Sequence, residues 1–289
     1  MYLPPESFPP IEGSIVKHPF ERILLATEHT EFDSGSERVA FEMARRCGLP
    51  LMAVLPVVSN PEFEIAAPQL AARNDREAAS KVDALRNTAM QLGVQLDIQV
   101  RHGEERYREI VNEAREKQAD LIITRRRGKR SFMAKLLIGE MVSKVAGHAP
   151  CSVLLVPRNG TMWSNGVLAA VDDSEHSRRI TSMAAAIAKE CALPLTILSV
   201  AETTALHEKA EMVASRYTGM AAGLNVVARQ LVLTGRPHEQ ILAAGKSAGA
   251  DLIVMGQRGE SNAVVRMLLG STMQKVVGMA DQPVLVVPA

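Results

Sequence analysis

The segment DLIITRRRG at residues 120–128 returns 131 positions later as DLIVMGQRG at residues 251–259. The sequence that follows matches at the same offset, because LLIGEMVSKVAGHA at 136–149 corresponds to MLLGSTMQKVVGMA at 267–280. In both copies an apolar run leads into a loop that contains glycine and arginine, and a helical pattern comes after it. Similarity over segments of this length predicts two copies of one domain in tandem.

The earlier part of each copy matches at a different offset. ILLATEHTE at 23–31 lies over VLAAVDDSE at 167–175, an offset of 144 residues. The first copy is therefore the longer one, mostly between residues 58 and 92. We predict domains at 20–159 and 160–289, preceded by a Pro-rich N-terminal arm at 1–19.

Short apolar runs alternate with helical patterns in both copies. The runs that we predict as strands are 23–26, 51–58, 94–100, 121–124 and 152–156 in the first copy, and 167–171, 195–201, 226–232, 252–255 and 284–287 in the second. Strands that are apolar on both faces and alternate with helices indicate a parallel sheet covered on both sides. The predicted fold class is α/β, with two tandem open, doubly wound, parallel five-stranded sheets of the Rossmann-like type.

Composition excludes several classes of function. Apolar residues make up 47% of the 289 residues and the formal net charge is +1, so the chain is neither disordered nor held to DNA or a membrane by bulk charge. Aromatic residues are only 3%, which disfavours stacking platforms for single-stranded nucleic acid. No apolar run reaches the roughly 20 residues of a membrane span. The three cysteines form no Cys-x-x-Cys pair, and we expect a cytoplasmic protein without a disulfide framework or a metal site.

Polar residues follow the apolar strands of the second copy. Asp172, Asp173 and Ser174 come directly after the first strand, where a carboxylate could bind a ribose hydroxyl or the edge of a base. The alternative is that Asp173 or Ser174 caps a turn or the next helix. Ligands bind such sheets beyond the carboxyl ends of the strands, so both roles remain open here.

A glycine-containing segment follows the fourth strand of the second copy. Gly256 and Gly259 flank Gln257-Arg258, and Gly270-Ser271-Thr272 opens a helix after ten residues. Glycines allow the backbone to approach a phosphate closely, and N–H groups at a helix N-terminus point at the anion. Ser271 and Thr272 add hydroxyl donors and are also expected to cap the helix. The alternative is a Gly-rich turn without a ligand.

These residues together resemble the universal stress protein (UspA-like) family. The resemblance rests on VDDS at 171–174, GRP at 235–237, DLIVMGQRG at 251–259 and GS at 270–271, and it covers about residues 20–289. ATP-binding members of that family carry nine residues between Gly-x-x-Gly and Gly-Ser or Gly-Thr, whereas both copies here carry ten. The resemblance implies an adenine nucleotide site in the second domain, formed by Ala170, Val171, Asp172, Val200, Met255, Gly256, Arg258, Gly259, Gly270, Ser271 and Thr272.

Each of these residues has an implied role in the resemblance. Asp172 would hold the adenosine end, and Ala170 and Val200 would face the base. Met255 would pack against the nucleoside. The residues from Gly256 onward would surround the phosphates, with Arg258 able to pair with phosphate oxygens.

The first copy departs from this pattern. Glu28 replaces Asp172, Arg125 replaces Gly256 and Glu140 replaces Ser271. A side chain at the first glycine position and a negative charge at the helix start both oppose an anion. We expect no ATP site in the first domain. The basic run at 125–130 could grip a polyanion or a phosphate, or it could be a solvated loop paired with acidic residues.

Catalysis finds little support in the sequence. Asp172, Ser174 and His176 are residue types that form catalytic triads. They lie within five residues of one another, however, whereas triads are assembled from separate segments. The seven histidines show no metal-ligand spacing, and His238 is interpreted as an exposed first-turn residue. We therefore predict no catalytic residues and no metal site.

The interpretation is a stress-protection or regulatory module that binds ATP or a related adenine nucleotide, with or without Mg²⁺. A scaffold of the same fold without nucleotide and a slow ATPase are the alternatives. No DNA or membrane partner is expected. The resemblance also implies an assembly, because members of that family often dimerise through their last strand, and an exposed last strand would otherwise be a pairing liability. We therefore predict that the final strands of the two domains, 152–156 and 284–287, pack against each other within one chain and make it a pseudo-dimer, with a homodimer left open.

Overall fold

The computed structural model describes residues 19–126, 139–257 and 270–288. Of the predicted N-terminal arm at 1–19, all but the last residue lies outside the described residues. Within the described ranges, no helix is both long enough and apolar enough to cross a membrane.

The strands follow the repeat. Those of the first half are β1 (Ile23–Ala26), β2 (Leu51–Val58), β3 (Leu96–Gly103), β4 (Leu121–Arg125) and β5 (Ser152–Val156). Those of the second half are β6 (Val167–Val171), β7 (Leu195–Ala201), β8 (Ala228–Thr234), β9 (Leu252–Gly256) and β10 (Val284–Val287). Central strands such as β1, β4, β5 and β9 are buried along their whole length, as apolar runs in a covered sheet should be.

Helices connect these strands in the predicted alternating order. The first half contains α1 (Ser34–Cys47), α2 (Pro61–Ala66), α3 (Pro68–Leu92), α4 (Arg106–Glu116) and α5 (Glu140–His148). The second half contains α6 (His176–Glu190), the 3₁₀ turn η1 (Thr204–Leu206), α7 (His207–Gly223), α8 (Pro237–Ser247) and α9 (Ser271–Met279). The additional length of the first copy lies in α2 and in the long helix α3.

All ten strands belong to one sheet, in the order β3-β2-β1-β4-β5-β10-β9-β6-β7-β8. Strands within each half are parallel, whereas β5 and β10 pair antiparallel, with Leu154 opposite Leu285. The predicted pairing of the two final strands is therefore present. The α/β fold class is confirmed, and the two predicted five-stranded sheets are continuous with each other.

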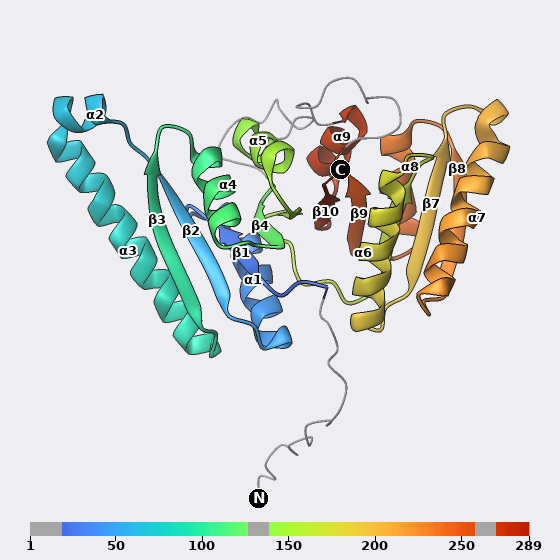
Figure 1. Cartoon of the computed structure of the whole chain (residues 1–289), viewed down its shortest axis with the longest axis horizontal. Coiled ribbons are helices and arrows are strands. Elements are labelled where there is room, and N and C mark those ends of the chain that lie inside the picture. The colour runs from blue at the N-terminus through green and yellow to red at the C-terminus, as the bar shows by residue number, and fades with distance from the viewer. Residues whose placement is uncertain (1–18, 127–138, 258–269, 289) are drawn as a thin grey trace, which may run out of the picture.

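Helices cover both faces of this sheet, as Figure 1 shows. One face packs on α1, α3, α6 and α7, and the other on α4, α5, α8 and α9. Successive residues of β1 alternate between the two cores, with Ile23 in one and Leu24 in the other. This alternation is the two-residue period of a strand that is buried on both sides.

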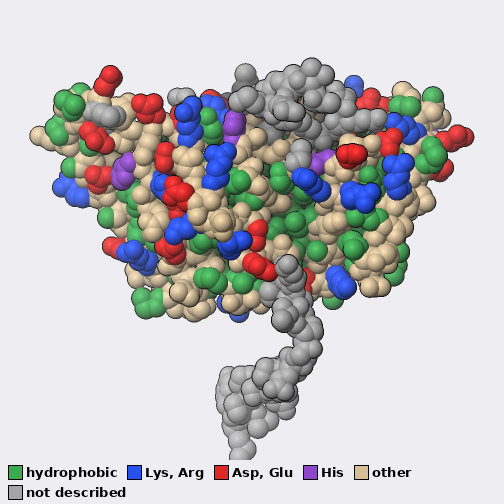
Figure 2. Space-filling view, in the orientation of Figure 1, with side chains coloured by type: hydrophobic (Ala, Val, Ile, Leu, Met, Phe, Trp, Pro, Cys, Tyr) green, Lys and Arg blue, Asp and Glu red, His purple; other side chains and the backbone are tan. Residues whose placement is uncertain are grey.

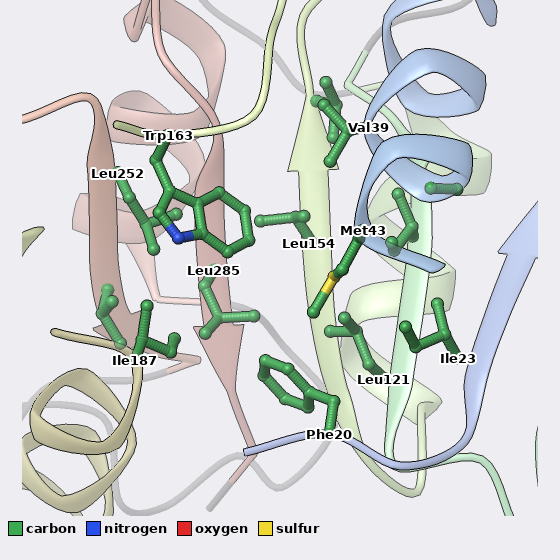
Figure 3. Packing of buried hydrophobic residues seen from close by; sticks show 14 of the residues in the cluster. Phe20, Ile23, Val39, Met43, Leu121, Leu154, Trp163, Ile187, Leu252 and Leu285 are labelled. Carbon is green, nitrogen blue, oxygen red and sulfur yellow. The ribbon is translucent and has the colours of Figure 1, made fainter. Parts of the chain in front are cut away.

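The hydrophobic core continues across the junction of the two halves. Trp163, Leu154 and Leu285 belong to one buried cluster that also contains residues of α1 and α6. Figure 3 shows the Trp163 ring beside Leu285, with the Leu154 side chain pointing toward it from the neighbouring strand. The connection between the halves thus contributes a large apolar side chain to the packing that unites them.

The third strand of each half begins later than predicted. β3 and β8 begin at Leu96 and Ala228, two residues after the starts predicted at 94 and 226. In the first half, helix α3 runs to Leu92 and Gly93 reverses the chain with φ of 67°. The N–H of Val94 still donates to Ala89 O, so this residue belongs to the helix end rather than the strand.

Candidate nucleotide site

A cavity of about 560 Å³ opens beyond the carboxyl ends of β6, β7 and β9 in the second half. This is where parallel α/β sheets place their ligands, because strand order reverses around the first strand of each half. The predicted site residues within the described ranges all line it, namely Ala170, Val171, Asp172, Val200, Met255, Gly256, Gly270, Ser271 and Thr272. Arg258, Gly259 and the ten-residue spacer lie outside the described residues.

The walls of the cavity include residues that the sequence interpretation did not assign to the site. Helix α7 contributes Lys209, Ala210 and Val213, and α8 contributes Pro237 and Ile241. The apolar members of this set make one side of the cavity suitable for a flat apolar group, while the strand ends and α9 supply polar groups. Their contribution depends on how α7 and α8 pack against the strands of the second half, which strand patterns alone do not reveal.

Asp172 stabilises the turn between β6 and α6. Its Oδ1 accepts hydrogen bonds from the Ser174 backbone N–H at 3.2 Å, from the Ser174 hydroxyl, and from the Ser177 hydroxyl at 2.9 Å. The predicted alternative, in which Asp173 or Ser174 caps this turn or the next helix, names the wrong residue. The turn is held by the carboxylate of Asp172 itself, which also lines the cavity.

Asp173 forms ion pairs instead. Its carboxylate lies 2.9 Å from Arg216 Nη1 and 3.3 Å from Lys209 Nζ, both on α7. The hydrogen bond from Arg216, followed by the one from Lys209, lowers the pKa of the Asp173 carboxyl. These pairs connect the β6–α6 turn to the helix that forms the outer wall of the cavity.

The start of α9 forms the other polar side of the cavity. Gly270 is the N-cap residue, and among the described residues no side chain caps this end. The prediction that Ser271 and Thr272 cap the helix is therefore wrong, because they stand inside its first turn. First-turn N–H groups without a partner in the helix, together with the helix dipole, favour a bound anion at this end.

The corresponding place in the first half is filled by a buried arginine. Arg125 stands at the position of Gly256, and its guanidinium lies 2.8 Å from Asp33 Oδ2 and 2.6 Å from Glu28 Oε1. The side chains of Arg125 and Asp33 are only 8% and 1% exposed. A cation and two carboxylates thus occupy the strand ends where the second half has its cavity.

This arrangement bears on the basic run at its first residue alone. Arg125 pairs with acidic residues, as one of the two interpretations has it, but it is buried and not solvated. Residues 127–130 of the run lie outside the described residues. On the face drawn in Figure 2, basic and acidic side chains are interspersed over the coloured surface.

The triad-type residues do not form a triad. The His176 ring nitrogen Nε2 donates to the backbone oxygen of Val287 at 3.0 Å, while the Ser174 hydroxyl donates to Asp172. A hydroxyl that is to be a nucleophile must donate to its base, and here His176 is engaged with β10 instead. Within the described ranges, no group of three His, Cys, Asp or Glu side chains is arranged to hold a metal ion.

His238 is more buried than the sequence indicated. It lies on the first turn of α8 as expected, but its side chain is only 15% exposed. Burial, with a contribution from the positive charge of Lys275, lowers the pKa of the His238 imidazole. The prediction of an exposed residue is wrong because α9 packs beside α8.

Comparison with known proteins agrees with this architecture. The model of the universal stress protein family matches residues 19–157 and again 165–288. A universal stress protein of Thermus aquaticus is 38% identical over 134 residues, which are 42% of this chain and 96% of that protein. Universal stress protein YxiE of Bacillus subtilis is 30% identical over 152 residues, which are 43% of this chain and 98% of that protein.

A solved structure of a universal stress protein from Archaeoglobus fulgidus has the same fold over nearly the whole chain. Its TM-score is 0.70 at 20% identity, and the alignment covers 94% of this chain and 97% of that one. The sequence repeat and the ten-stranded sheet agree with the family match over both halves. The chain belongs to the universal stress protein family and carries two of its domains in tandem.

Proposed function

We propose that this chain is a regulatory or stress-protection module that binds one adenine nucleotide, with ATP as the expected ligand, in its second half. The observation that carries the proposal is the cavity of about 560 Å³ lined by all the predicted site residues that the structure describes. Its volume falls within the range of small-molecule and cofactor sites, about 300–1,000 Å³.

The two ends of the cavity suit the two ends of a nucleotide. The carboxylate of Asp172 is held in place by the turn that it stabilises, so it can accept a hydrogen bond from a ribose hydroxyl. Val200 and Met255 offer apolar contact to the nucleoside. Gly270 and the first turn of α9 offer backbone N–H groups to phosphate oxygens.

The residues present fit a nucleotide better than they fit a protein-held metal ion. The described residues bring no cluster of three metal-ligating side chains together. Mg²⁺ is commonly bound by one or two carboxylates and by the phosphates of its substrate. An accompanying Mg²⁺ would therefore be held mainly by the phosphates.

The first half is not expected to bind a nucleotide of its own. The ends of its strands are filled by Arg125, so one nucleotide per chain is expected. The antiparallel pairing of β5 with β10 supports a second part of the proposal, which concerns assembly. We propose that the chain is in this sense its own pseudo-dimer.

Calorimetric titration of the full chain with ATP tests the proposal. We expect one site per chain, with and without Mg²⁺. Two equivalent sites would contradict the assignment to the second half. The absence of binding by ATP, ADP and AMP would favour a scaffold of the same fold that binds no nucleotide.

A further inference from the structure

Gln257 joins the candidate site to the other half of the molecule. It follows Gly256 at the end of β9, and it is only 7% exposed. Its side-chain amide Nε2 donates to the backbone oxygen of Ala146, a residue of α5 in the first half that is fully buried. A buried polar side chain between two domains needs a reason, because an unpaired amide at this place would be costly.

The position of Ala146 in helix α5 explains why its carbonyl accepts from Gln257. Ala146 lies in the last turn of α5, where a carbonyl would ordinarily accept from the N–H four residues later. That residue is Pro150, which has no N–H. The Ala146 oxygen therefore needs a donor from outside the helix, and the amide of Gln257 supplies it.

The backbone of Gln257 is bonded to β10 and to the start of α9. Its N–H donates to Val287 O at 3.2 Å, which attaches the end of β9 to β10. Its carbonyl accepts from the N–H of Gly270 at 2.9 Å, which attaches the start of α9 to the end of β9. Gly256 and Gly270, on either side of these bonds, both line the cavity.

We propose that Gln257 is a positioning residue through which the first half sets the geometry of the phosphate end of the nucleotide site. The proposal rests on the proposed function. Gln257 is not part of the cavity lining. It fixes the relative position of Gly256 and the first turn of α9, and its own side chain is fixed by Ala146. The first half thus contributes to nucleotide affinity although its own strand ends are filled by Arg125.

The substitution Gln257→Met tests this role, because methionine has a similar volume and cannot donate to Ala146 O. ATP and adenosine are titrated into wild type and variant. We expect ATP affinity to fall by roughly tenfold and adenosine affinity to change by less than about threefold, since only the phosphate end is displaced. Gln257→Asn, whose amide is too short to reach Ala146 O, is expected to fall in the same direction.

The matched control is Arg38→Met. Arg38 Nη1 donates to the backbone oxygen of Gly160 at 2.7 Å, so this change also removes a bond from a side chain to the main chain, but away from the cavity. The control should leave the ratio of ATP to adenosine affinity unchanged. Melting temperatures of all variants without ligand separate a loss of folding from a loss of binding.

The titrations distinguish a failure of the role of Gln257 from a failure of the proposed function. If wild type binds neither ligand, the proposed function is wrong. If wild type binds ATP and both Gln257 variants bind it equally well, or lose ATP and adenosine affinity in the same proportion, Gln257 does not position the phosphate end.

Discussion

Arg125 Nη1 lies 2.8 Å from Asp33 Oδ2, and both side chains are almost completely buried, in a place where the second half of the chain has a cavity. Glu28 completes the group at 2.6 Å from the other guanidinium nitrogen, and the hydroxyl of Thr30 accepts at 3.3 Å. Because charges in a low-dielectric interior must be paired, this group is expected to be structural and sensitive to loss of one member.

Arg125→Met should therefore destabilise the protein. It leaves the buried carboxylate of Asp33 without its cation, and we expect the free energy of unfolding to fall by about 3 kcal/mol. Urea denaturation followed by circular dichroism measures the change. The double variant Arg125→Met/Asp33→Asn should recover part of the loss.

The control for this change is Arg158→Met. Arg158 lies 3.5 Å from Glu31, and both side chains are more than half exposed, at 55% and 61%. Exposed pairs contribute little, so we expect a change below about 1 kcal/mol. Equal losses in the two variants would show that the Arg125 pairs are no stronger than a surface pair.

Gly256→Arg should weaken ATP binding. The substitution copies the residue of the first half into the second, where it would project into the cavity that Gly256 lines. We expect a loss of at least tenfold in affinity, about 1.4 kcal/mol, in equilibrium dialysis. Ser271→Ala should cost less, on the order of 1 kcal/mol, because the backbone N–H groups of α9 remain.

Gly219→Arg provides the matched control. Gly219 lies in α7, and a Cβ added there meets nothing within 4 Å. This variant should bind ATP as wild type does. ATP affinity of wild-type strength in Gly256→Arg would show that the phosphates are held elsewhere.

Leu154→Ala should weaken both halves together. Leu154 is 0% exposed and opposes Leu285 across the β5–β10 junction, inside a core cluster that draws on both halves. We expect a loss of about 3 kcal/mol from the cavity that it leaves, with unfolding still a single transition. Met90→Ala, at a side chain 75% exposed, should change stability by less than about 0.5 kcal/mol.

Calorimetry and denaturant titration of Leu154→Ala check this. Two separate transitions, with only one of them shifted, would mean that the halves unfold independently despite their shared core.

His238 should make stability depend on pH in a defined direction. Burial holds the pKa of the folded imidazole below its ordinary value of 6.5, so near and below that pH the unfolded chain binds a proton more readily than the folded protein. The stability that neutral His238 permits is therefore present above about pH 6.5 and is lost as the pH falls toward the folded pKa.

The measurement compares wild type with His238→Gln. Between about pH 7.5 and about pH 5.5, wild type should lose more free energy of unfolding than the variant, by a small amount. Parallel pH profiles for the two proteins would show that His238 has no lowered pKa.

The repeat, the alternation of strands and helices, and the end of the sheet at which the candidate site lies could all be predicted from the sequence. These follow from local patterns, because apolar runs fix the strands and the carboxyl ends of parallel strands meet at one edge. The residues predicted to form the site meet there wherever the structure describes them. The pairing of the two final strands was also predicted, from the family resemblance, whereas its antiparallel direction came from the structure.

The partner of each buried polar side chain, by contrast, could be read from the folded structure alone. Arg125 is paired with Glu28 and Asp33, which precede it by 97 and 92 positions, and Gln257 donates to a carbonyl 111 positions away. A basic run looks the same in sequence whether it is solvated or buried. The difference arises because folding removes water from the strand ends, and each charge or amide left there must then find a partner from a distant segment.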